Sequence, residues 1–204
     1  MAYSGMGTTW LSSKLTRMPS KASKVNELCL GWLCSVAYSN CNGGEGDLLE
    51  MYSGCSNHTV GIAKFFRSVV CVELNKALCE AAKYNLGLNN ITNVAVITGP
   101  SEKFARAILR KGSYRDANRE YSFNAVLVDP PRGGLDADTR SLLRRGQFRS
   151  IIYISCNPDS LVRDLHIICS DGTYRVERFA VCDHFAYSRG HLESLVLLTR
   201  NVLL

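Results

Sequence analysis

The sequence predicts an α/β fold in which seven strands form a doubly wound, mostly parallel sheet with an antiparallel strand at its carboxyl end. Apolar, strand-sized segments alternate with helical segments, and this order is typical of parallel sheets that carry helices on both faces. Only the stretch 182–192 separates the last two strand-like segments. So short a connection cannot make a parallel crossover, and we therefore expect these two strands to pair antiparallel.

The amino-terminal part of the chain differs in composition from the rest. Its first 26 residues contain four basic residues and no acidic one, and they are rich in Ser and Thr. Apolar residues recur at helical spacing from Ser20 onward, and the Gly- and Asn-rich stretch 40–46 then ends this helix. We therefore divide the chain into an N-terminal segment with a lead-in helix, 1–46, and a main domain, 47–204.

The other elements follow in order from the same periodicities. Strands are expected at Asp47–Met51, Ser68–Leu74, Val94–Thr98, Ala125–Val128, Ser150–Ser155, Arg175–Val181 and Glu193–Thr199. Helices are expected at Asn57–Phe66, Asn75–Leu86, Glu102–Leu109, Ala137–Arg144 and Ser160–Ile168.

Length and composition narrow the classes of function. A chain of 204 residues with 46% hydrophobic content is long enough for one α/β domain with a core, and we expect a monomer. No apolar run approaches the roughly 20 residues of a membrane span. The net charge of +6 favours a polyanionic partner such as RNA, although a solvated helix face explains clustered arginines equally well.

The nine cysteines lie mostly in apolar stretches without the spacing of a disulfide framework, which indicates reduced thiols in an intracellular protein. We expect it in the cytoplasm, or in an organelle if the basic, acid-free start is a transit peptide. Cys29, Cys34 and Cys41 lack the close pairs of structural zinc sites, so we predict no metal.

Two strand ends carry the signals of a nucleotide-like cofactor. The first strand runs into Tyr52-Ser53-Gly54-Cys55-Ser56-Asn57, where Gly54 lets the backbone approach a ligand closely. Glu73 ends the second strand about 20 residues later, where a carboxylate can accept hydrogen bonds from a ribose. A simple strand-to-helix turn also explains the glycine, and NAD-binding domains use the same pair.

Two further strand ends carry the signals of chemistry. Asp129-Pro130-Pro131-Arg132-Gly133-Gly134-Leu135-Asp136 follows the fourth strand, and its prolines hold Asp129 extended at the strand tip. Ser155-Cys156-Asn157-Pro158 follows the fifth strand and places a thiol at the same edge. A strand-capping turn and a buried packing cysteine remain the simpler explanations of each segment taken alone.

Taken together and in this order, these segments resemble the RNA uracil-5-methyltransferase family of class I, Rossmann-like methyltransferases. The resemblance covers about residues 47–200 and rests on Asp-Leu-Leu-Glu-Met-Tyr from Asp47, the two segments just quoted, and His-Leu-Glu from His191. The first of these segments looks more like the tRNA branch, which makes ribothymidine in the T loop, than the ribosomal-RNA branches.

The resemblance implies a catalytic domain that methylates carbon 5 of a uridine in RNA with S-adenosylmethionine as cofactor. Cys156 would be the nucleophile that adds to carbon 6, and Glu193 the base that removes the proton from carbon 5. The family's cofactor contacts carry over to four positions: Tyr52, Asn57, Glu73 and Asp129. Without the family context, Glu193 reads equally well as an exposed strand acid.

The chain also departs from the family pattern. Met18 stands where members usually have a glutamine that contacts the cofactor, Ser56 replaces a glycine of the loop, and Gly190 replaces a histidine. His191 and Arg189 are candidates for RNA contact. The upstream RNA-binding part of many members is missing from these 204 residues. The alternatives are an inactive RNA-binding relic, a member that acts on ribosomal RNA, or a methyltransferase that acts on an exocyclic amine.

Overall fold

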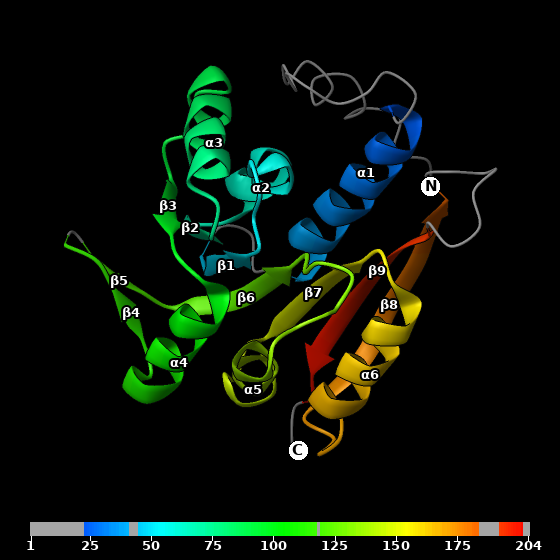
Figure 1. The fold of residues 1–204 in the computed structure, drawn as a ribbon. Helices are drawn as coiled ribbons and strands as arrows, with labels where there is room; N and C mark the ends of the chain where they lie inside the picture. Colours follow the sequence, from blue (N-terminus) through cyan, green and yellow to red (C-terminus); the bar gives the residue numbers. More distant parts are fainter. Residues whose placement is uncertain (1–22, 41–44, 118, 184–191, 202–204) are drawn as a thin grey trace.

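A computed structural model describes residues 23–40, 45–117, 119–183 and 192–201 (Figure 1). Its main feature is a seven-stranded sheet with the strand order β3-β2-β1-β6-β7-β9-β8, beside a separate two-stranded hairpin of β4 and β5. The strands β3, β2, β1, β6 and β7 are parallel to one another, and β9 runs antiparallel to both β7 and β8. The prediction of a mostly parallel sheet with an antiparallel end is therefore confirmed.

The bounds of the elements are close to those expected. The strands are β1 (Asp47–Met51), β2 (Ser68–Glu73), β3 (Val94–Thr98), β4 (Tyr114–Arg115), β5 (Glu120–Tyr121), β6 (Phe123–Val128), β7 (Ser150–Ser155), β8 (Tyr174–Asp183) and β9 (Leu192–Arg200). The helices are α1 (Ser23–Asn40), α2 (Asn57–Ile62), the 3-10 helix η2 (Ala63–Phe65), α3 (Lys76–Leu88), α4 (Ser101–Lys111), α5 (Ala137–Arg145) and α6 (Pro158–Ile168).

Two details differ from the expectation. The helix expected at Asn57–Phe66 changes to a 3-10 turn at Ala63, so α2 itself has only six residues. The β4–β5 hairpin was not expected, because its strands have two residues each and carry no visible periodicity. It is held by contacts among aromatic rings, in which Tyr114 lies 4.7 Å from Phe104 and 5.5 Å from Tyr121 between ring centroids.

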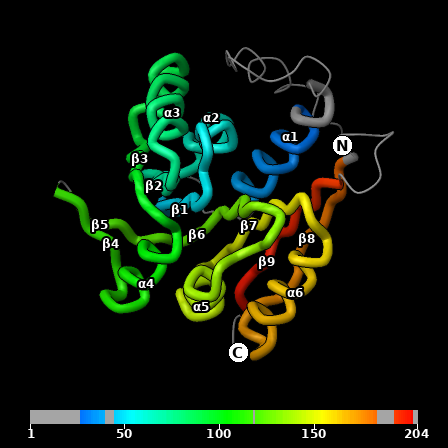
Figure 2. Tube along the Cα trace, in the orientation of Figure 1, coloured from blue at the N-terminus to red at the C-terminus, as the bar shows by residue number. Residues whose placement is uncertain are grey.

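Helices cover both faces of the sheet, with α1, α2 and α3 on one side and α4, α5 and α6 on the other (Figures 1 and 2). The alternation of side chains along β1 builds both cores. Leu49 and Met51 belong to the core under α4, α5 and α6, whereas Leu48 belongs to the core under α1 and α2. Because both faces are covered, every residue of β1 is buried.

The amino end of β1 is fixed by a buried ion pair. Asp47 has no solvent exposure, and its carboxylate accepts hydrogen bonds from the Arg67 guanidinium at 2.6 and 3.0 Å and from Arg119 at 2.9 Å. Although burial raises the pKa of Asp47, the bonds from Arg67 and from the Ser122 amide bring it below its ordinary value. This cluster lies at the end of β1 opposite to the candidate site and serves the fold.

Of the helices that the structure describes, none combines the length and the apolar character that a membrane crossing requires.

Candidate active site

The antiparallel register of β7 and β9 brings the two predicted chemical residues together. Ser155, the last residue of β7, is paired with Ser194 of β9. Cys156 follows this last pair on one strand and Glu193 precedes it on the other, so both lie at the same edge of the sheet although they are 37 positions apart in the sequence. Because β7 and β9 are neighbouring strands, a thiol and a carboxylate at these strand ends are candidates to act on one ligand.

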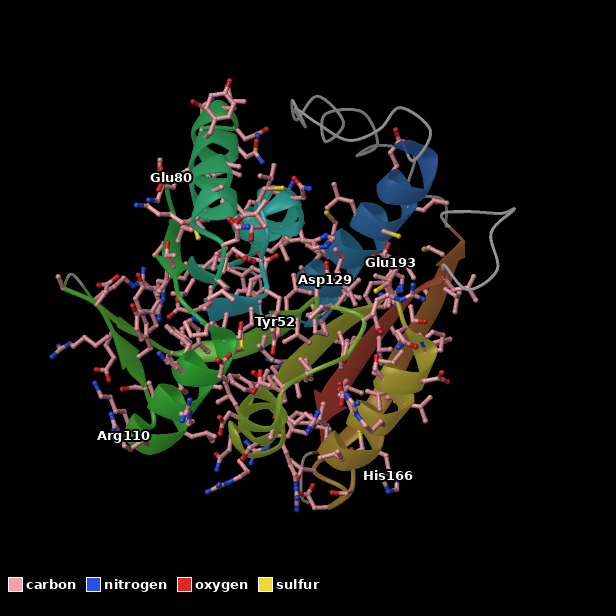
Figure 3. The ribbon with its side chains drawn as sticks, in the orientation of Figure 1. Tyr52, Glu80, Arg110, Asp129, His166 and Glu193 are labelled. Atoms are coloured by element: carbon pink, nitrogen blue, oxygen red, sulfur yellow. The ribbon has the colours of Figure 1, made fainter. Side chains whose placement is uncertain are left out.

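The neighbouring parallel strands bring the other predicted residues to the same edge. β6 lies between β1 and β7, and its last residue, Val128, is paired with Met51 on one side and with Tyr153 on the other. Asp129 follows directly, and its amide lies 3.5 Å from the Met51 carbonyl oxygen. Figure 3 shows Tyr52, Asp129 and Glu193 over the middle of the molecule, whereas Glu80, Arg110 and His166 lie toward its outside.

The loop between β1 and α2 has an unusual backbone. Tyr52, Gly54 and Ser56 all have positive φ angles, of 60°, 55° and 60°. This region is unfavourable for residues with a side chain, so its use at Tyr52 and Ser56 marks a functional loop. A Cβ atom added to Gly54 would meet nothing within 4 Å, which leaves room beside the loop for a ligand.

Glu73 is fixed against this loop. One oxygen of its carboxylate accepts a hydrogen bond of 2.9 Å from the Gly54 amide, and the other accepts one of 2.7 Å from the Asn75 amide. The half-buried carboxylate therefore has a defined orientation beside the open space at Gly54. Asn57, another predicted cofactor contact, is the half-buried first residue of α2 at the end of the same loop.

The Tyr52 hydroxyl points toward α5. It lies 2.6 Å from Oδ2 of Asp136 and 3.2 Å from Oγ1 of Thr139, and burial together with Asp136 raises the pKa of Tyr52. Asp136 also caps α5 by accepting a 2.8 Å bond from the Thr139 amide. The first loop and the proline-containing loop are thus tied together by side chains.

Asp129 faces a histidine that the sequence analysis missed. Nε2 of His58, on α2, lies 3.3 Å from Oδ2 of Asp129, and the two side chains are 28% and 35% exposed. Burial lowers the pKa of His58, but the bond to Asp129 and the charges of Asp129, Glu50 and Glu193 raise it to about 9. A single histidine at the start of a helix gives no signal of its own in one sequence, and only the fold places it opposite Asp129.

Beneath the loop lies a second residue that the sequence analysis did not single out, Glu50 of β1. It is fully buried, its Oε2 accepts a hydrogen bond from the Thr59 hydroxyl, and its Oε1 has no hydrogen-bond partner. Burial raises the pKa of Glu50 to about 7, against the opposing effect of His58. The hydroxyls of Ser53 and Ser56 are also buried without a partner, so unused polar atoms gather under this loop.

Cys156 is half-buried at the start of a rigid turn. Asn157 caps α6 by accepting a 3.1 Å bond from the Asp159 amide, and its own amide group donates a 2.8 Å bond to the Arg132 carbonyl oxygen. The turn is thereby attached to the proline-containing loop. The helix begins at Pro158, two residues before the expected Ser160, so Cys156 lies close to its amino end.

Asp164 on α6 also binds the proline-containing loop to α6, and the sequence analysis did not single it out. It has no solvent exposure, and its Oδ2 accepts bonds of 2.8 Å from the Leu135 amide and 2.7 Å from the Tyr153 hydroxyl. Gly134, with φ of 79°, passes so close that an added Cβ would lie 2.6 Å from Asp164. Only glycine therefore fits at this position of the loop.

Other predictions lie outside the described residues. Met18, Arg189, Gly190 and His191 belong to segments that the structure does not describe. In the described part of the chain, no three His, Cys, Asp or Glu side chains are grouped so that they could hold a metal ion.

Comparison with known proteins identifies the family. A family model described as tRNA (Uracil-5-)-methyltransferase matches residues 17–201. A tRNA/tmRNA (uracil-C(5))-methyltransferase of Pseudoalteromonas atlantica is 39% identical over 180 residues, which cover 86% of this chain and 47% of the relative. A protein of the same name from Aromatoleum aromaticum is 42% identical over 181 residues, which cover 86% and 46%. The chain thus spans about half the length of these relatives.

Solved structures agree with this result. The tRNA (uracil-54, C5)-methyltransferase of Pyrococcus abyssi in complex with S-adenosyl-L-homocysteine superposes with a TM-score of 0.63 at 25% identity, over 85% of this chain and 38% of the other. A SAM-dependent methyltransferase of Agrobacterium tumefaciens shares the fold alone, with a TM-score of 0.62 at 15% identity over 86% and 62%. The fold is that of class I methyltransferases, and the chain belongs to the tRNA (uracil-5-)-methyltransferase family.

Proposed function

We propose that this chain forms the catalytic part of an enzyme that transfers a methyl group from S-adenosylmethionine to carbon 5 of a uridine in RNA. The observation that supports the proposal is the pairing of Ser155 with Ser194, which brings the strand ends next to Cys156 and Glu193 to the sheet edge where β6 runs into Asp129. This reaction needs a nucleophile and a base on one substrate ring, and an α/β sheet offers both only where separate strands end together.

Cys156 and Glu193 act in different steps of the proposed reaction. Carbon 5 of uracil is too weak a nucleophile to accept a methyl group unaided, so the Cys156 thiolate first adds to carbon 6 and makes carbon 5 enolate-like. After carbon 5 has taken the methyl group, Glu193 removes its remaining proton. The carbon–sulfur bond then breaks and releases Cys156.

The loop after β1 and the end of β2 fit S-adenosylmethionine, whose sulfonium supplies the methyl group. Glu73 has a fixed carboxylate that suits ribose hydroxyls, and the space beside Gly54 admits a ligand close to the backbone. Tyr52 and Asn57 flank the same loop. Asp129 completes the set from the neighbouring strand.

We propose tRNA as the substrate and uridine 54 of its T loop as the target. The names of the curated relatives and of the Pyrococcus abyssi enzyme support this choice. The net charge of +6 is favourable for binding a polyanion. Mass spectrometry of nucleosides from tRNA and rRNA after deletion of the gene tests it, and loss of 5-methyluridine from rRNA alone would favour the ribosomal alternative.

The mechanism is tested with Cys156→Ser. We expect this variant to form no 5-methyluridine, because a hydroxyl is a far weaker nucleophile than a thiolate, while S-adenosylhomocysteine still binds in isothermal titration. Cys169→Ser is the matched control, since Cys169 is a half-buried thiol that follows α6 at its far end.

An RNA that carries 5-fluorouridine at the target gives a second test. Fluorine cannot be removed by a base, so the adduct with Cys156 should persist and shift the protein on a denaturing gel. Full activity of Cys156→Ser would instead favour methylation of an exocyclic amine. A chain that binds tRNA without methylating it would favour the RNA-binding relic.

A further inference from the structure

His58 is a positively charged residue surrounded by carboxylates from three strands. It pairs with Asp129 at the tip of β6, and the charges of Glu50 on β1 and Glu193 on β9 also act on it. The proposed reaction gives His58 no part, and nothing in the sequence around it marks a role. Its contact with Asp129 nevertheless makes a role in the candidate site worth testing.

The negative charges of this site create a problem for the proposed chemistry. Asp129 and Glu193 would repel both a Cys156 thiolate and the negative charge that develops on a uracil ring after the thiolate adds. A half-buried cation among the carboxylates offsets this repulsion, because charges interact more strongly away from bulk water.

The surroundings of Asp129 also indicate that His58 orients its carboxylate. Pro130 and Pro131 follow it and have no amide hydrogen, so this side of the loop cannot donate backbone hydrogen bonds to the carboxylate. Farther along the loop, the Gly134 amide donates its hydrogen bond to the Pro131 carbonyl oxygen. The carboxylate of Asp129 therefore takes its orientation from His58, 3.3 Å away.

We infer that His58 is a positioning residue of this site, which holds the Asp129 carboxylate in place and supplies the positive charge that a thiolate and a uracil enolate need nearby. This inference rests on the proposed function. It also explains why His58 sits on α2, since the helix carries it from the cofactor loop to the tip of β6. The role requires the charged form of the imidazole, which Asp129, Glu50 and Glu193 together maintain.

The pair is tested first without any reaction, by NMR titration of the imidazole of His58. We expect the pKa of His58 in the wild-type chain to be about 9 and to fall by at least about one unit in Asp129→Asn, because the pairing charge is lost. A midpoint near the ordinary value of about 6.5 that Asp129→Asn leaves unmoved would overturn the inference whatever the activity.

The role is tested second by kinetics. His58→Gln keeps a hydrogen-bond donor without the charge, and we expect it to lower kcat/KM for 5-methyluridine formation by about 10- to 100-fold through misplacement of Asp129 and loss of the charge. His58→Phe, which also removes the donor, should lower it further. His166→Gln on the exposed end of α6 is the matched control and should retain wild-type activity.

The pH profile separates this role from a structural one. The wild-type rate should fall as pH rises through about 9, where His58 loses its proton, and this fall should be absent from His58→Gln. A His58→Gln variant with the activity and pH profile of His166→Gln would overturn the inference. A wild-type chain that methylates neither tRNA nor rRNA would overturn the proposed function and this role with it, while the NMR titration still reports on the pair itself.

Discussion

Glu50 shows at the scale of a single residue how the site constrains the core beneath it. A lone buried carboxylate is costly, and here Thr59 satisfies one oxygen while the other has no partner. Burial therefore raises the pKa of Glu50 to about 7 from its ordinary value of 4.5. Stability that depends on the protonated form is fully present below pH 4.5 and is lost as the pH rises through 7.

Glu50→Gln should remove this dependence, because the amide stays neutral and still offers an acceptor to Thr59. Between pH 4.5 and 7 we expect the free energy of unfolding of the wild type to fall relative to the variant, by an amount on the order of 3 kcal/mol at most. Urea denaturation at pH 4.5, 6 and 8 measures it. Glu80→Gln on the exposed face of α3 is the control, and identical curves for Glu50→Gln and wild type would contradict the prediction.

At the scale of an element, β1 is held differently at its two ends. Its carboxyl end opens into the loop with positive φ angles, and its amino end is fixed by Asp47 with Arg67 and Arg119. Arg67 directly precedes β2 and Arg119 directly precedes β5, so this one carboxylate also attaches the β4–β5 hairpin to the sheet. The ion pairs of Asp47 thus fix the amino end of β1, and the loop with positive φ angles lies at its carboxyl end.

Asp47→Asn should therefore destabilise the fold strongly, because it leaves two guanidinium groups beside a neutral side chain. We expect a loss of about 3 to 5 kcal/mol, the usual cost of breaking a buried pair. Because pairing lowers the pKa of Asp47, the difference from wild type should be present above about pH 4 and shrink as the pH falls below it.

Chemical denaturation at pH 7 and pH 3 checks this prediction. Asp138→Asn is the matched control, since the pair of Asp138 with Arg106 is 39% and 58% exposed and is worth at most about 1 kcal/mol. Equal stability of the two variants at pH 7 would show that the buried pair does not fix β1.

At the scale of the whole molecule, two cores on opposite faces of one sheet hold the site edge in place. α1 lies outside the predicted main domain in sequence, yet Leu33, Val36 and Ala37 are buried against the sheet together with Leu195 and Leu197 of β9. The strand that carries Glu193 thus rests on a helix from the start of the chain. α1 and β9 are expected to lose stability together.

Leu33→Ala should cost about 2 to 5 kcal/mol of unfolding free energy, because Leu33 has no solvent exposure and its loss leaves a cavity. Leu28→Ala on the same helix is the control, since Leu28 is 68% exposed and should change stability by less than about 0.5 kcal/mol. Thermal unfolding of both variants measures the difference. Equal melting temperatures would mean that α1 does not support the sheet.

The order and kind of the elements could be predicted from the sequence, because apolar periodicity is a local property. Candidate residues at four strand ends could be named as well, because prolines, glycines and acids after a strand have local meaning. Within the described residues the sequence analysis missed the β4–β5 hairpin, whose strands are too short for a pattern. It also missed His58, Glu50 and Asp164, each of which is an ordinary residue in its own segment.

Which of these residues lie near one another depends on the three-dimensional fold. The register of two antiparallel strands brings the strand ends next to Cys156 and Glu193 to one sheet edge, and the approach of a helix to the tip of a strand joins His58 to Asp129. A strand register and a helix approach depend on packing of the whole core, and contacts across 71 positions leave no trace in the periodicity of either segment. The chain's residue types thus set the chemistry that is available, and the packing of the sheet sets which groups can use it together.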